Sequence, residues 1–476
     1  MTVFPASAAL LAIWLVQSLR NPDNGIVVAI ALLPFGMFAA VSLGGLSIIA
    51  AHLIAMLTVA LFLLRWASRR GALRLGQVPA AGLFLALYAI YAAFSATVLV
   101  RLFAGEFLVF PMTVNMTGTA VSIYFRSTMT LLRPDNSNIA QTLYIVLSCG
   151  FFFAAAETFR RRSPQFAEVG LTWAASLNVA LGLLDLAQLD ALLAVIRTAD
   201  YSLANEHMLS GFSRIIGGYS EASGFGAASA AFFAYFAMSF LIHRRGLHGL
   251  LALASLACTL MSLSSSGLLA LAGALLFIGL HGRVYLGHSM SRSFAHWFVI
   301  GTAVTAAFAS VAMLATPASD VAADVLDRLV LSKSSSHSGL ERSAWAKAGF
   351  DAFIQTWGLG AGAGSLRSNG LAAVLLGSVG LPGTLAFLGF LWRSIGGGAR
   401  FADAEDRRVF YAARISAMTL LIAMLLAGTT PDPTLFLVTT TAMATAVRQR
   451  GAAVRRPPVQ KSNRVRGGFP GTGDVI

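Results

Sequence analysis

Basic side chains gather in three long polar segments of a chain that is otherwise strongly apolar. The segments cover residues 104–138, 185–221 and 317–369. Their basic residues are Arg126, Arg133, Arg197, Arg214, Arg328, Lys333, Arg342, Lys347 and Arg367. Arginine binds phosphate well because its planar guanidinium can form two parallel hydrogen bonds. As a group these residues indicate an anionic ligand, although each one singly can pair with an acid such as Glu341 or extend its charge from an apolar surface.

One of these arginines lies close to a carboxylate in the sequence. Glu221 follows Arg214 and the glycine pair Gly217–Gly218, and it directly precedes an apolar run. A carboxylate at the mouth of a helix can act as a general base. The structural alternative is that Glu221 only complements the helix dipole, with Ser220 as the N-cap.

The segment from Ser338 to Asn369 carries a second pattern. Ser338 and Glu341 match the S-x-x-E capping box, which predicts a helix starting at Gly339. Its apolar side consists of Trp345, Phe350, Phe353 and Trp357. This composition predicts a helix that lies in the outer interface of a membrane with its aromatic side chains directed inward.

A glycine run, GLGAGAGS at residues 358–365, follows this helix. Alternating glycines permit unusual backbone angles and close approach. The run can form a nest of peptide N–H groups that binds an anion, or a tight connection to the next apolar helix. It is no Walker loop, because no Lys-Ser or Lys-Thr pair follows it.

The overall composition excludes a soluble protein. Of the 476 residues, 57% are hydrophobic and 11% are charged, with a mean hydropathy of +0.74, whereas soluble domains carry about 25% charged residues. The net charge of +14 would suggest a nucleic-acid partner in a soluble protein. Here much of it lies in the tail after Val447, which is typical of a positive-inside membrane anchor, and we expect no nucleic-acid partner.

Thirteen apolar runs approach the length of about 20 residues that a spanning helix needs. They cover residues 6–19, 26–43, 46–66, 79–103, 139–159, 166–184, 222–242, 247–263, 267–282, 296–316, 370–392, 414–428 and 434–447. Lipid offers no partner for an unpaired peptide group, so these runs must be helices. The sequence therefore predicts an all-α polytopic membrane protein with 12 or 13 transmembrane helices, depending on whether the short first run crosses.

Loop charge predicts the orientation of the bundle. The basic connections around residues 65–74, 160–162, 243–245, 283–292 and 400–408, and the C-terminal tail, all fall on one side, which we assign to the cytoplasm. The three long polar segments then face the outside. We expect one transmembrane bundle over residues 1–447 and a basic, disordered cytoplasmic tail over residues 448–476.

Several kinds of site have no signal in the sequence. The outer segments hold no acidic pair for a hard cation, and the chain has no Walker, zinc or G-x-S-x-G motif. We therefore expect no metal and no cofactor. Few charges fall inside the apolar runs, whereas an ion-coupled transporter usually has more of them.

Taken in order, three blocks resemble the O-antigen ligase and Wzy-type polysaccharide polymerase superfamily. Residues 212–236 resemble its R-x-x-G-x-[FY]-x-E block, and residues 264–276 resemble its S-[RS]-[TS]-G helix start. Residues 338–388 are similar to its late block, which runs S-x-x-x-R-x-x-x-W, a G-x-G-x-G-S turn, an Asn and G-L-x-G. The recognisable similarity covers roughly residues 205–395, and the N-terminal third matches only in hydrophobicity.

This resemblance implies a glycosyltransferase with a GT-C-like fold in the bacterial inner membrane, with its active face in the periplasm. Its donor would be an undecaprenyl-diphosphate-linked oligosaccharide, used without a metal. A polymerase transfers the glycan to another lipid-linked repeat unit to build an exopolysaccharide or O-antigen, and it works beside a flippase and a chain-length regulator. A ligase transfers the glycan to lipid A-core. Family ligases usually carry a His just before the Asn of the late block, where this chain has Arg367 and Ser368 before Asn369, and this difference favours the polymerase.

The resemblance and the chemistry together give each candidate residue a role. Breaking a sugar–diphosphate bond requires stabilisation of the leaving diphosphate. We expect Arg214, Arg342, Arg328 and Arg367 to bind it, with Trp345 and Asn369 of the late block also contacting substrate. Glu221 or His337 would act as the base that accepts the proton of the acceptor hydroxyl. A different class, a flippase or transporter of the same lipid-linked sugar, stays open and would show an internal cationic cavity at mid-membrane.

Overall fold

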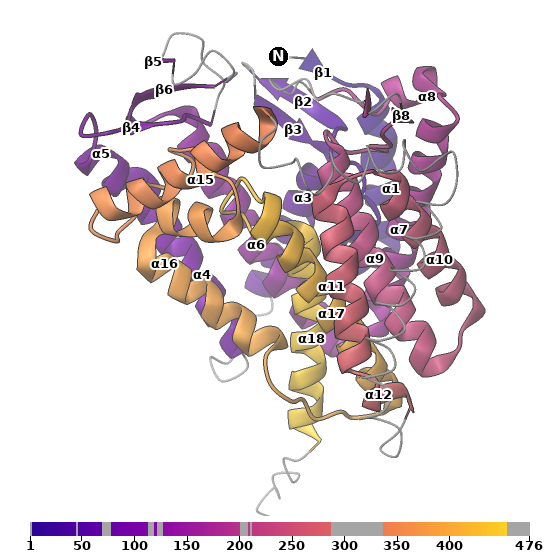
Figure 1. The fold of residues 1–476 in the computed structure, drawn as a ribbon. Coiled ribbons are helices and arrows are strands. Elements are labelled where there is room, and N and C mark those ends of the chain that lie inside the picture. Colours follow the sequence, from indigo (N-terminus) through magenta and orange to yellow (C-terminus); the bar gives the residue numbers. More distant parts are fainter. Residues whose placement is uncertain are drawn as a thin grey trace, which may run out of the picture.

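The chain folds into a bundle of helices topped at one end by short strands (Figure 1). The computed structural model describes residues 2–43, 46–68, 78–112, 119–120, 127–199, 208–209, 212–286 and 337–454. It is 73% helix and 4% strand, and seven of its described helices are long and apolar enough to cross a membrane. The predicted all-α polytopic membrane fold is thereby confirmed.

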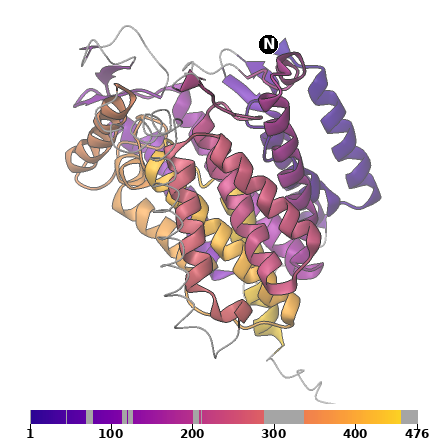
Figure 2. The same ribbon diagram turned by 45° about the vertical axis from the view of Figure 1, so that its right-hand side comes forward.

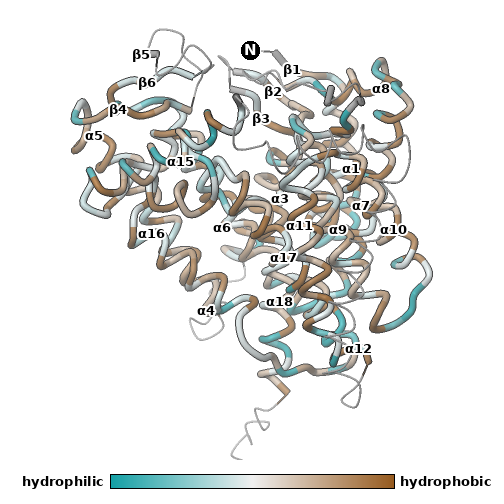
Figure 3. The backbone as a smooth tube through the Cα atoms, in the orientation of Figure 1, coloured by the Kyte–Doolittle hydropathy of each residue, from teal (hydrophilic) through white to brown (hydrophobic). Residues whose placement is uncertain are grey.

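The seven long apolar segments share high hydropathy and few charges. They are α3 (Ala50–Ser68), α4 with its extension (Ala80–Leu102), α6 (Asn136–Arg161), α7 (Gln165–Leu186), α9 (Ala222–His243), α16 (Leu371–Ile395) and α17 (Ala404–Ala427). Three shorter apolar helices accompany them, namely α1 (Ala6–Arg20), α10 (Gly246–Met261) and α11 (Ser265–Leu280). Figure 3 shows hydrophobic residues along these helices and hydrophilic residues mainly toward the two ends of the bundle.

The remaining elements are short, except for α15 and α18 with 19 residues each. The helical ones are α2 (Asn24–Ala31), the π-helical turn η2 (Ser95–Leu99), α5 (Val100–Leu102), α8 (Asp190–Ala194), α12 (Arg283–Leu286), α15 (His337–Gln355) and α18 (Leu435–Ala453). The strands are β1 (Thr2–Val3), β2 (Ala39–Leu43), β3 (Leu46–Ile49), β4 (Leu108–Val109), β5 (Thr119–Ala120), β6 (Thr128–Leu131), β7 (Met208–Leu209) and β8 (Phe212–Ser213). All of the strand pairs are antiparallel, in the orders β1-β2-β3, β4-β6-β5 and β7-β8.

The two ends of the bundle differ in character. One end, here called the strand end, carries the strands together with α5, α8 and α15 (Figure 1). The other, here called the basic end, carries α12 and the last turns of α18. The described basic connections all lie at the basic end, where Arg161 and Arg65 both contact Asp23 and Arg245 contacts Glu405. The described parts of these connections therefore share one end of the bundle, and the rest of the predicted set lies outside the described residues.

The prediction of a helix over residues 26–43 was wrong for the second half of that range. Helix α2 ends at Ala31, and strand β2 begins at Ala39 and pairs with β3. Pro34 and Gly36 lie in the interrupted stretch between them, and neither residue favours a helix interior. Figure 2 shows the N-terminal elements, in indigo, as a layer at one side of the bundle.

Helix α18 is buried although it is rich in threonine. Thr439, Thr440 and Thr441 are completely buried. Each hydroxyl donates to a carbonyl of the preceding turn, as in the bond from Thr439 to Leu435 at 2.7 Å. Because the hydroxyls are satisfied within the helix, they can be buried at low cost. The helix continues past Val447, the expected end of the bundle, to Ala453.

Helix α15 begins at His337, two residues before the predicted start at Gly339. The aromatic side chains of this segment differ in how far they are buried within the protein. Trp345 is 6% exposed, but Phe350 is 43% and Trp357 is 84% exposed. The capping-box residue Glu341 contacts another segment, described below. Helix α15 thus presents Trp345 to the protein and Phe350 to the surroundings, and the exposed Trp357 lies in the turn that follows the end of the helix at Gln355.

Candidate functional site

Glu221 occupies the N-cap position of α9, which begins at Ala222. The predicted cap, Ser220, was one residue early. The Glu221 side chain makes no capping hydrogen bond to the helix backbone, and its Oε2 accepts a hydrogen bond from the Ser223 hydroxyl at 2.9 Å. The carboxylate therefore lies at the mouth of the helix and is 33% exposed.

A clamp fixes the turn that leads to Glu221. Asp185, at the end of α7, accepts hydrogen bonds from the backbone N–H groups of Ile216 at 2.7 Å and Gly217 at 2.9 Å. Arg197 forms an ion pair with Asp185 at 2.8 Å, and its Nε donates to the Gly217 carbonyl at 2.9 Å. Arg197 is thus occupied in holding this turn, which is the structural role that we left open for each single arginine.

Arg342 of α15 faces Glu221 across the strand end. Its Nη2 lies 3.7 Å from Glu221 Oε2, and each of the two side chains is 33% exposed. This distance is too long for a hydrogen bond, so the attraction is that of an open ion pair. The structure brings together two of the predicted site residues that are far apart in the sequence.

Arg367 is the second guanidinium at this place. It lies over the ring of Trp345 at 5.2 Å, its backbone N–H donates to the Phe110 carbonyl at 2.6 Å, and its Nη2 donates to the Met112 carbonyl. Burial lowers the pKa of the Arg367 guanidinium, and the charges of Glu221 and Glu341 oppose that shift. Arg367 is therefore a partly desolvated cation within electrostatic reach of Glu221.

Glu341 and Trp345 meet at Ser127. Glu341 Oε1 accepts from the Ser127 backbone N–H at 3.0 Å and from its hydroxyl at 2.6 Å. The Ser127 hydroxyl in turn accepts from the indole N–H of Trp345 at 2.9 Å. This chain of bonds fixes the ring on which Arg367 lies.

The remaining predicted site residues have varied outcomes. Arg214 is half-buried and lies between β8 and α9. The amide of Asn369 donates to the Leu426 carbonyl at 3.3 Å, so it contacts the end of α17. His337 is the first residue of α15, and its side chain lies outside the described part of the structure. Arg328 also lies outside the described residues.

The glycine run has a structural role. The N–H groups of Ala361 and Gly362 donate to the carbonyls of Gly377 and Ser378 in α16, at 2.8 and 2.9 Å, and the Ala363 N–H donates to the Ser95 hydroxyl in the π-helical turn. These donors are not directed at an anion, so the alternative of a tight connection to the next helix is favoured over a nest.

Backbone packing explains why glycine is needed in this run. Gly360 has a φ of +88°, and a Cβ there would lie 2.5 Å from the backbone nitrogen of Gly380. Gly380 itself breaks α16 with a φ of 59° and a ψ of −164°. The glycine run therefore packs against the kink of α16, and this packing positions Arg367 beside α15.

The site thus combines a carboxylate with two guanidiniums held by different elements. The arginines can stabilise negative charge on a phosphate-bearing group, and Glu221 can accept a proton from a hydroxyl. Comparisons with protein-family models, with curated proteins and with solved structures found no match for this chain. The resemblance drawn from the sequence motifs stays a prediction.

Sequence reasoning missed Ser127 and the carbonyl of Met112 as parts of this site. Ser127 is 214 positions from Glu341, and no local pattern marks it. The S-x-x-E pattern did mark Glu341, but it indicated a contact within its own helix. In the structure the Glu341 carboxylate instead accepts hydrogen bonds from Ser127, in the segment before β6.

Proposed function

We propose that this protein is a membrane glycosyltransferase that polymerises undecaprenyl-diphosphate-linked oligosaccharide units into a bacterial surface polysaccharide. The observation that carries the proposal is the pair of Glu221 and Arg342, 3.7 Å apart, with Arg367 in electrostatic reach. The strand end would then face the periplasm of the inner membrane, in agreement with the positive-inside rule for the basic end.

In the first step the site must stabilise the leaving group. The bond between the sugar C1 and the diphosphate oxygen breaks, and negative charge develops on the diphosphate. Arg342 and Arg367 can hold that charge through charge-assisted hydrogen bonds. The hydrogen bond from Arg367 to the Met112 carbonyl and its stacking on Trp345 fix the guanidinium in advance, so little reorganisation is needed at the moment of reaction.

In the second step the site must accept a proton. A hydroxyl of the acceptor repeat unit attacks C1, and its proton passes to Glu221. The diphosphate competes with Glu221 for Arg342, because the open ion pair at 3.7 Å is readily exchanged for direct bonds to phosphate. Donor binding thereby frees the carboxylate for the acceptor hydroxyl.

The test uses the purified full chain in liposomes with lipid-linked oligosaccharides extracted from the source membranes. The product is a ladder of lengths on a gel. We expect Arg342→Gln to slow its formation by about 10²–10³-fold, as for loss of one charge-stabilising donor. Glu221→Gln should slow it by about 10²–10⁴-fold, as for loss of a general base.

Lys347→Ala is the matched control, because Lys347 is an exposed cation on the same helix as Arg342. It should leave the ladder unchanged. Each variant is first checked for monodisperse elution in detergent. Wild-type ladders from both Arg342→Gln and Glu221→Gln would overturn the proposal. Transfer of single units to added lipid A-core, without any ladder, would reassign the protein to the ligase branch.

A further inference from the structure

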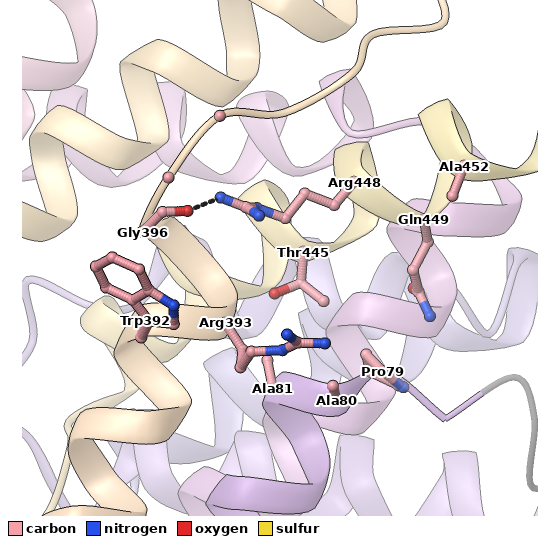
Figure 4. A pocket seen from close by; sticks show the side chains of 12 residues that line it. Pro79, Ala80, Ala81, Trp392, Arg393, Gly396, Thr445, Arg448, Gln449 and Ala452 are labelled. Carbon is pink, nitrogen blue, oxygen red and sulfur yellow. Dashed lines mark hydrogen bonds between the residues drawn. The ribbon is translucent and has the colours of Figure 1, made fainter.

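A second cluster of arginines borders a cavity at the basic end, far along the helices from Glu221. The cavity has a volume of about 400 Å³ and lies between the end of α16, the last turns of α18 and the start of α4 (Figure 4). Its lining includes Arg393, Arg448, Thr445 and Trp392. The volume falls within the range of about 300–1,000 Å³ that is usual for small-molecule sites.

Two buried polar atoms at this cavity have no hydrogen-bond partner among the residues that the structure describes, and an exposed arginine lies beside them. Thr445 is 3% exposed, and its hydroxyl makes no hydrogen bond within the described residues. The same holds for the buried Nε of Arg448. Arg393 has neither a hydrogen bond nor an ion pair with any residue that the structure describes. Buried polar groups are nearly always satisfied, so the Thr445 hydroxyl and the Arg448 Nε indicate a polar ligand, and the exposed Arg393 adds a positive charge beside them.

The charge of the cluster specifies an anion. Arg448 donates to the Gly396 carbonyl, and Arg414 donates to the Gly397 carbonyl at 3.1 Å. These carbonyl partners are neutral, so they do not offset the positive charge of either guanidinium. Arg393 and Arg414 are also near enough to Arg448 to repel it. Within the described ranges, no carboxylate forms an ion pair with any of the three arginines.

The acids at the start of α17 pair with a different arginine. Asp406 accepts from Arg450 at 3.0 Å, and Asp403 lies 3.7 Å from Arg450. Arg450 is two residues from Arg448 and is neutralised, whereas Arg448 is not. This contrast between neighbouring arginines separates the cavity cluster from ordinary basic anchoring.

The surroundings of the cavity favour a lipid as the source of the anion. Trp392 is 68% exposed beside it, and exposed tryptophan at a helix end is typical of the membrane interface. Basic pockets between helices on the positively charged side of a membrane protein suit phosphate head groups. We propose that this cavity binds the phosphate of an anionic phospholipid from the leaflet at the basic end, with Arg393, Arg448 and the Thr445 hydroxyl as its ligands.

Native mass spectrometry of the full chain, released from detergent with dioleoyl phosphatidylglycerol or dioleoyl phosphatidylcholine, tests the proposal. We expect the wild type to retain phosphatidylglycerol under activation that removes phosphatidylcholine. Arg393→Ala should weaken phosphatidylglycerol binding about fivefold, since one basic residue near anionic lipid contributes about that factor. Arg407→Ala removes one charge at the same end, where Arg407 donates to the Val284 carbonyl, and should bind like the wild type.

Thr445→Val separates a ligand role from a packing role. This variant keeps the shape of the side chain and removes a hydroxyl without a hydrogen-bond partner among the described residues, so the lipid-free protein should unfold at the same or a higher temperature. Its phosphatidylglycerol binding should still be several-fold weaker. Unchanged lipid retention in both Arg393→Ala and Thr445→Val would overturn the site.

Inorganic phosphate distinguishes the two sources of the same chemistry. We expect millimolar phosphate alone to leave the unfolding temperature of the detergent-solubilised wild type unchanged, while phosphatidylglycerol raises it. Equal stabilisation by phosphate would overturn the lipid assignment in favour of a soluble phosphate compound. Glycosyl transfer is not measured in any of these arms, so their outcome is independent of the proposed function.

Discussion

Glu341 holds Ser127 through two hydrogen bonds, one to the backbone N–H at 3.0 Å and one to the hydroxyl at 2.6 Å. The two residues connect α15 to the segment that precedes β6. Since Ser127 also accepts the indole N–H of Trp345, the position of the ring beneath Arg367 depends on the Glu341 carboxylate.

We predict that Glu341→Ala destabilises the protein by about 1.5–3 kcal/mol, the usual contribution of hydrogen bonds to a charged group. Glu341→Gln keeps an acceptor oxygen for Ser127 and should restore much of this loss. Thermal unfolding in detergent measures the difference. Ser343→Ala is the control, because the Ser343 hydroxyl donates to the Gly339 carbonyl of its own helix. Equal unfolding temperatures for Glu341→Ala and the wild type would refute the role.

At the basic end, Arg408 is fully buried in a network of ions. It lies 2.7 Å from Glu168 of α7 and 2.7 Å from Glu405, and Glu168 also contacts His248 at 3.0 Å. We predict that Arg408→Met destabilises the protein by about 3–5 kcal/mol, because it leaves Glu168 buried without its main counter-charge.

A double-mutant cycle checks this prediction. Replacing both partners, Arg408→Met with Glu168→Leu, should cost less than the sum of the two single changes, because no uncompensated charge is left. The open pair of Arg342 and Glu221 is the comparison, since both of its side chains are 33% exposed. Its coupling should be below about 1 kcal/mol. A strictly additive result for Arg408 and Glu168 would contradict the network.

The sequence specified the membrane helices well, because burial in lipid demands long apolar runs that are visible locally. The prediction failed at residues 39–49, where a local turn signal competes with the apolar character of the residues around it. The Gly44–Gly45 pair is a hairpin signal, yet the apolar residues around it suggested two helices. The structure pairs Ser42 with Ser47 and Val41 with Ile48 in β2 and β3.

The site was predicted in part for a related reason. Charged residues are conspicuous in an apolar chain, so Glu221, Arg342 and Arg367 could be singled out. Ser127 could not, since a serine carries no distinguishing pattern and its contacts come from distant segments. The glycine run was visible, but its partner Gly380 depends on how α16 bends.

Gly360 offers a test of that packing. We predict that Gly360→Ala lowers the yield of folded protein and its unfolding temperature, because the new Cβ would meet the Gly380 backbone at 2.5 Å with φ at +88°. The left-handed conformation alone costs about 1–2 kcal/mol. Gly246→Ala is the matched control, since nothing lies within 4 Å of a Cβ there. Equal unfolding temperatures for the two variants would contradict the packing.

Asp23 gives a prediction that depends on pH. It lies between α1 and α2, is 4% exposed, and contacts Arg65 and Arg161 at 3.1 Å and Arg162 at 2.8 Å. Burial by itself would raise the pKa of the Asp23 carboxyl, but the three arginines outweigh burial and hold the pKa below its usual value of 3.8.

A carboxyl whose pKa is depressed by folding stabilises the folded state above its unfolded pKa, and this stabilisation is lost as the pH falls through the folded pKa. At pH 7 we therefore expect Asp23→Asn to unfold at a lower temperature than the wild type in detergent. Below a pH of about 3.8 the difference should shrink, because the carboxyl of the unfolded wild type then takes up a proton first and the folded carboxyl follows at its lower pKa. Comparing each variant with the wild type at the same pH cancels the acid sensitivity of the other carboxylates. A difference that stays constant from pH 7 to pH 3 would mean that Asp23 contributes through its shape and hydrogen bonds rather than through its charge.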